Sequence, residues 1–147
     1  MPDERKGPYL IMVSFCENAL QEKDDVFSAI RLVDTINVSL EGEEVPQTMP
    51  KMLIQPWMIV RFASQNISGK RSLQVTGVAP SGKEQDLFTE RPVVFFEKEG
   101  TGVNIRIRVG LGLEEIGVYW FRVYLDGKLM GEAPLRITYQ ATQTAKT

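Results

Sequence analysis

The sequence predicts an all-β fold, an antiparallel β-sandwich of eight to nine short strands, with a closed barrel as the structural alternative. Three observations support this fold class. Turn signals recur at intervals of roughly ten residues, as they do in sandwiches. Several short runs alternate between apolar and polar residues, which is the pattern of half-buried strands. No stretch carries a convincing amphipathic helix pattern, so the expected core is built from sheets alone.

The most strongly marked element is a hairpin over residues 117–139. The dipeptide Asp126-Gly127 lies between two alternating runs. It predicts a type I′ turn, because both central residues of that turn need positive φ. Side chains alternate along a strand, so the first strand has an apolar face that should point into the core. That face holds Tyr119, Phe121, Val123 and Leu125, whereas the other carries Val118, Trp120, Arg122 and Tyr124.

The second strand of this hairpin needs one extra residue. A two-residue turn places Leu125 opposite Lys128, Tyr124 opposite Leu129 and Val123 opposite Met130. Met130 then points inward, but the next apolar set has the opposite parity: Leu135, Ile137 and Tyr139. A β-bulge between Gly131 and Pro134 would restore the register.

The N-terminal third contains one ambiguous segment. Residues 9–15 are mostly apolar and predict a first strand. Residues 17–34 favour a turn around 23–25 followed by a strand over 26–33, although their broken helical spacing leaves a helix as the alternative. Residues 35–41 alternate cleanly and predict a further strand.

The middle of the chain begins with a long connection. Residues 42–56 contain three prolines, and their apolar centre, 49–54, is expected to pack onto the body. Residues 57–63 predict a strand with two faces: Met58, Val60 and Phe62 on one, Trp57, Ile59 and Arg61 on the other. Further strands are expected before Ala79, over 92–97 and over 103–109.

The domain expectation is a single sandwich over residues 9–139. Residues 1–8 are charged, and residues 140–147 lack apolar anchors, so both ends are expected to be disordered. The chain has 147 residues and a net charge of −2, which argues against a nucleic-acid partner. It contains no apolar stretch of membrane-spanning length and no signal-peptide pattern, so a cytoplasmic location without a membrane partner is expected.

Three segments together carry a resemblance to a known family. They are an apolar strand leading to Cys16-Glu17, the segment Ile30-Arg31-Leu32-Val33-Asp34, and Gly117-x-Tyr119-x-Phe121-x-Val123-x-x-Asp126-Gly127. In these the chain resembles a family of small uncharacterised bacterial proteins with an immunoglobulin-like β-sandwich fold. The resemblance covers residues 9–139. It implies the fold but carries over no catalytic or binding residues.

The residue inventory offers little for catalysis. The chain has no histidine, which removes Ser-His and Cys-His nucleophile pairs and the commonest zinc ligand. Cys16 is the only cysteine and has no cationic neighbour in sequence, so it is expected to be a buried structural thiol. Adjacent acids at residues 24–25, 43–44 and 114–115 are expected in solvated turns. Residues 110–115 begin like a dinucleotide-binding loop, but the pattern ends in Glu115. We therefore expect no catalytic residues, no cofactor and no metal.

The candidate interaction surface is the outer face of the hairpin. Trp120, Arg122 and Tyr124 alternate on that face, and aromatic and arginine side chains are enriched in interface hot spots. If the strand over 57–63 pairs beside the hairpin, Trp57, Ile59 and Arg61 join the same surface. The alternative is that the segment 49–54 folds over this face and buries it.

Three functional classes remain at this stage. The first is a non-catalytic protein-interaction or structural module, whose simplest partner is a second copy of the chain. The second is a carbohydrate-binding module, because Trp and Tyr stack on sugar rings. The third is a hydrolase that uses loop carboxylates, which would need several acids gathered in a pocket.

Overall fold

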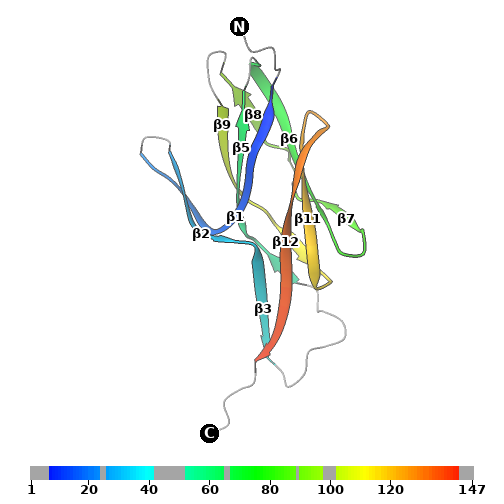
Figure 1. The fold of residues 1–147 in the computed structure, drawn as a ribbon. Coiled ribbons are helices and arrows are strands. Elements are labelled where there is room, and N and C mark those ends of the chain that lie inside the picture. Colours follow the sequence, from blue (N-terminus) through cyan, green and yellow to red (C-terminus); the bar gives the residue numbers. More distant parts are fainter. Residues whose placement is uncertain are drawn as a thin grey trace.

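The computed structural model describes residues 7–23, 26–41, 52–64, 67–88, 90–97 and 102–142, and within them the chain forms strands and no helix (Figure 1). The described strands are β1 (Tyr9–Gln21), β2 (Phe27–Val33), β3 (Thr35–Glu41), β4 (Met52–Ile54), β5 (Trp57–Ala63), β6 (Gly69–Val78), β7 (Glu84–Asp86), β8 (Val93–Phe96), β9 (Gly102–Arg108), β10 (Leu111–Leu113), β11 (Gly117–Leu125) and β12 (Lys128–Thr142).

Two sheets form the sandwich. The first sheet has the order β2-β1-β5-β9, and the second has the order β3-β12-β11-β6-β7, with β8 also paired to β6. Strands β10 and β4 make a separate two-stranded sheet. In chain order, β1, β5 and β9 correspond to strands A, B and E of an immunoglobulin domain, and β6, β11 and β12 to strands C, F and G. The predicted immunoglobulin-like sandwich is confirmed.

The core lies between the inner faces of the two sheets. The predicted inward set of β11 is buried along its whole length: Tyr119, Phe121, Val123 and Leu125. Met58, Val60 and Phe62 of β5 are completely buried opposite them. The ring centroids of Phe15 on β1 and Phe121 on β11 are 4.6 Å apart, so this pair joins the two sheets at their centre.

The hairpin has the predicted turn but a different bulge. Asp126 has φ 48° and Gly127 φ 79°, and Leu125 pairs with Lys128 as expected. The register shifts at Met130, and Gly131–Pro134 then pair regularly with β11, so the predicted bulge position is wrong.

Gly131 and Pro134 occupy regular ladder positions for other reasons. A side chain at Gly131 would meet the end of the Leu10 side chain on β1. Pro134 pairs with Trp120 on a part of β12 that β3 does not reach, because β3 begins pairing at Arg136. An edge position tolerates the missing N–H of proline, and Pro134 therefore marks an edge instead of a bulge.

The segment 17–34 forms strands on both sides of a turn, so the alternative of a helix is wrong. β1 continues to Gln21 and pairs antiparallel with β2. We call the part of this hairpin beyond Cys16 the arm (residues 17–23 and 26–31). Figure 1 shows the arm standing out from the sandwich on the side of β9. It is inserted where the chain would otherwise pass from β1 directly to β3.

Three further differences concern the sheets. Among the described strands, the sandwich is antiparallel as predicted except for one pair, because β3 runs parallel to β12. The chain crosses between the sheets at Asp34, so the direction of β3 is not set by a hairpin. The described residues form twelve strands, where the sequence predicts eight or nine, since β4, β7 and β10 are three residues long and too short to show alternation. Strand β12 continues to Thr142, past the predicted domain end at 139, and residues 1–6, 42–51 and 143–147 lie outside the described residues.

Candidate interaction surfaces

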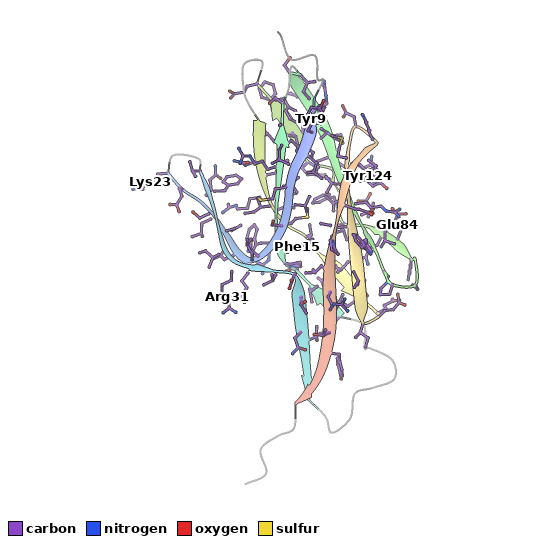
Figure 2. All side chains as sticks on the ribbon, viewed as in Figure 1. Tyr9, Phe15, Lys23, Arg31, Glu84 and Tyr124 are labelled. Carbon is purple, nitrogen blue, oxygen red and sulfur yellow. The ribbon has the colours of Figure 1, made fainter. Side chains whose placement is uncertain are left out.

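The predicted surface on the hairpin lies on the outer side of the second sheet. We call it the hairpin face and define it by Trp120, Arg122, Tyr124 and Leu129. Trp120 is 42% exposed, whereas Arg122 and Tyr124 are partly buried. Figure 2 shows Tyr124 on the side of β11 that faces away from β1 and Phe15. The first three predicted residues are therefore brought together, as alternation along β11 requires.

Neighbouring strands frame each of these side chains. Trp120 is flanked by Pro134 of β12 and Val78 of β6. Arg122 pairs across the strands with Glu132, and its Nε lies 3.6 Å from Glu132 Oε2. That nitrogen is buried and makes no hydrogen bond, so the carboxylate holds the guanidinium by charge alone. Both side chains therefore have neighbours on the adjacent strands.

The apolar surface extends beyond the hairpin. Val93 and Phe95 of β8 pair with Ser72 and Lys70, which lie on the same side of β6 as Gln74 beside Tyr124. Phe95 is 55% exposed. Several apolar side chains therefore face solvent on one side of the second sheet, a feature typical of contact surfaces.

Trp57 and Arg61 do not join the hairpin face, and this prediction is wrong. Strand β5 lies in the first sheet between β1 and β9, on the other side of the sandwich. Trp57 is opposite Arg108, Ile59 opposite Arg106 and Arg61 opposite Asn104. Alternation correctly separates the two faces of β5, but it contains no information about which strand pairs beside it.

The arm covers part of the outer side of the first sheet, where Trp57 and Ile59 lie. Cys16, Ala19 and Ile59 form a small buried cluster with Trp57 packed against it. Arg106 Nη1 donates a hydrogen bond of 2.9 Å to the carbonyl oxygen of Ala19. The alternative prediction is that residues 49–54 fold over the hairpin face. The described part of this segment, Met52–Ile54, instead pairs with β10.

Cys16 is the buried thiol that the sequence predicts. It is 1% exposed and lies under the arm. Burial raises the pKa of the Cys16 thiol, because desolvation disfavours the thiolate, and a hydrogen bond to the backbone of Ile30 offsets only part of this effect. A protonated, covered thiol is a poor nucleophile.

The structure also contains a pocket of about 220 Å³ beside β10. Gln85 closes one side, since its amide donates to the carbonyl of Gly112 and accepts from the N–H of the same residue. Lys83 Nζ lies 3.5 Å from Glu114 Oε2, and Ser81 Oγ donates to Glu115 Oε2 at 2.7 Å. The charged groups around the pocket therefore already have partners within the chain.

Tyr119 also lines this pocket. Alternation predicts its place in the core, but not the role of its hydroxyl. The hydroxyl donates to the carbonyl oxygen of Glu115 at 2.9 Å and accepts from its N–H at 3.2 Å. This is the tyrosine corner of immunoglobulin-like domains. A tyrosine two residues before the core residue Phe121, at the start of the penultimate strand, is the signal that could have revealed it.

Neither a metal cluster nor a membrane-spanning helix occurs in the part of the chain that the structure describes. It contains no group of three or more Cys, Asp or Glu side chains placed to hold a metal ion. Nor does it contain a helix long and apolar enough to cross a membrane.

The comparison with family models decides the family. A model described as a family of unknown function (DUF6941) matches residues 11–138, which is most of the chain. The chain belongs to this family. The predicted resemblance to an uncharacterised family is confirmed, and the strand order of the two sheets is that of an immunoglobulin-like sandwich.

Solved structures give more distant similarities. An immunoglobulin-like protein from Pseudomonas aeruginosa is 12% identical, with a TM-score of 0.41 over 92% of this chain and 99% of that one. The alkylpurine DNA glycosylase AlkC from Pseudomonas fluorescens, bound to DNA containing an abasic site analogue, is 16% identical with a TM-score of 0.41. That match covers 71% of this chain, which spans only 28% of the glycosylase. No curated protein matches the chain.

Proposed function

We propose that this protein is a non-catalytic interaction module whose hairpin face binds protein, most simply a second copy of the chain. The observation that carries the proposal is the 42% exposure of Trp120 at the centre of a sheet face. A large aromatic side chain in that position leaves much apolar surface in contact with water. A partner that covered the ring would remove this surface from water, which is favourable.

The composition of the face supports a protein partner. Trp, Tyr and Arg are the side chains that most often dominate binding energy in interfaces. Here Trp120 and Tyr124 flank Arg122, and Leu129 and Phe95 add apolar area at the margin. Because Arg122 is already held by Glu132, little side-chain freedom is lost on binding.

Carbohydrate binding is the less favoured alternative. A sugar site of this kind needs aromatic rings that form an open platform. Arg122 stands between the two rings of β11, and Tyr124 is half-buried beside Leu129 and Gln74. The arrangement is better suited to the mixed apolar and charged surface of a protein.

Light scattering across a concentration series tests the proposal. We expect wild-type protein to form a dimer whose population rises with concentration, and Trp120→Glu to remain monomeric because it places a charge at the centre of the interface. Leu53→Glu is the matched control, since Leu53 is 62% exposed on β4, outside the hairpin face. It should dimerise like wild type. A wild-type protein that stays monomeric throughout would contradict self-association through this face.

A further inference from the structure

The outer side of the first sheet carries a cluster of arginines. Arg106 and Arg108 are two residues apart on β9 and point to the same side as Trp57 and Ile59, their partners on β5. Arg61 follows two residues after Ile59 on that side. We call Arg61, Arg106 and Arg108 the arginine cluster; all three are exposed.

The guanidinium groups of two of these arginines lie over one aromatic ring, that of Trp57. The guanidinium carbons of Arg106 and Arg108 lie 5.3 Å and 5.8 Å from the centroid of the Trp57 ring. Both contacts are within the range of cation–π attraction. Positions two apart on a strand are only about 7 Å apart, so the two like charges also repel one another. An anion placed between them would relieve this repulsion.

The arginine cluster has no carboxylate partner among the described residues. Ion pairs there involve Arg31, Arg71, Arg91 and Arg122, but not the arginine cluster. Arg136 of β12, in the other sheet, is not among these pairs either. Arg106 and Arg108 instead donate to neutral carbonyl oxygens, those of Ala19 and Gln55, at 2.9 Å and 3.2 Å. These hydrogen bonds orient the guanidinium groups without cancelling their charge.

We propose that the arginine cluster binds an acidic, extended peptide segment of a partner protein. β9 is the last strand of the first sheet, so a peptide can lie along it. In an extended peptide, every second side chain faces the same way, and acid-x-acid spacing therefore matches Arg106 and Arg108. Carboxylates accept paired hydrogen bonds from guanidinium groups, and the arm forms a wall beside the site.

The charge pattern favours a peptide over a nucleic acid. Nucleic-acid binders commonly neutralise many phosphates, whereas this cluster offers three arginines on a chain with net charge −2. The surface belongs to the other sheet, so binding there does not depend on the hairpin face.

Fluorescence anisotropy with a labelled synthetic peptide of alternating Glu and Thr tests the proposal. We expect saturable binding that weakens as salt is added, and no binding of the same peptide with Gln in place of Glu. The double variant Arg106→Gln/Arg108→Gln should weaken binding about tenfold or more, because it removes charge-assisted hydrogen bonds.

The matched control is Arg71→Gln/Arg91→Gln, which removes the same charge from arginines that are already paired with Asp126 and Asp86. It should bind the peptide like wild type. Arg108→Gln alone keeps the contact of Arg106 with the arm, so it should fold normally and show an intermediate loss. The proposal is overturned by absent peptide binding, by equal losses in both double variants, or by equal affinity for a single-stranded oligonucleotide.

Discussion

Tyr119 shows how one hydroxyl organises the end of the sandwich. Its ring is buried in the core, and its oxygen satisfies both the N–H and the carbonyl of Glu115 in the loop before β11. The same loop borders the pocket beside Lys83 and Glu114. Removing the hydroxyl leaves two backbone groups without their partner.

Tyr119→Phe should therefore lower the free energy of unfolding by about 1–3 kcal/mol, the cost of leaving buried polar groups unpaired. Urea denaturation measures the change. Tyr124→Phe is the control, because that side chain is half-exposed on the hairpin face and should cost under about 0.5 kcal/mol. Equal stability of Tyr119→Phe and wild type would show that the tyrosine corner contributes nothing.

At the scale of elements, the arm is the least expected feature. Its inner side rests on the first sheet through Ala19, which is almost completely buried against Ile59. Its other side faces solvent. Leu20 and Ile30 point to the side of the arm away from Ala19, and both are exposed. A single small residue thus sets how closely the arm approaches the sheet.

Ala19→Arg should lift the arm from the sheet and expose the thiol beneath it, because the longer side chain has no space against Ile59. We expect Cys16 in the wild type to react slowly with a thiol reagent at neutral pH, and at least about tenfold faster in the variant. Leu20→Arg, on the solvent side of the arm, is the control and should react at the wild-type rate. Equally slow reaction of both variants would show that the arm does not protect the thiol.

At the scale of the whole molecule, local signals account for the correct predictions. Asp126-Gly127 specifies its turn through its own φ angles, and alternation identifies the buried sides of β5 and β11. The errors concern contacts between distant residues. The bulge falls at Met130 and not between Gly131 and Pro134, a position that no local residue pattern specifies. Which sheet receives Trp57 depends on β1 and β9 pairing on either side of it, which no local pattern records.

The resulting molecule has two different outer surfaces. The second sheet presents the hairpin face, where an exposed Trp120 lies beside a neutralised Arg122. The first sheet presents the arginine cluster, where two guanidinium groups lie over Trp57 and form no ion pair with another described residue. If both proposals hold, the two faces bind separate partners, one by apolar contact and one by charge.

Acrylamide quenching of Trp120 fluorescence tests the central claim, protein binding through the hairpin face, most directly. The experiment uses Trp57→Phe, which leaves Trp120 as the only tryptophan of the chain. The account predicts strong quenching in dilute protein and several-fold weaker quenching in concentrated protein, as a second copy covers the ring. Quenching that is equally strong at every concentration would contradict it.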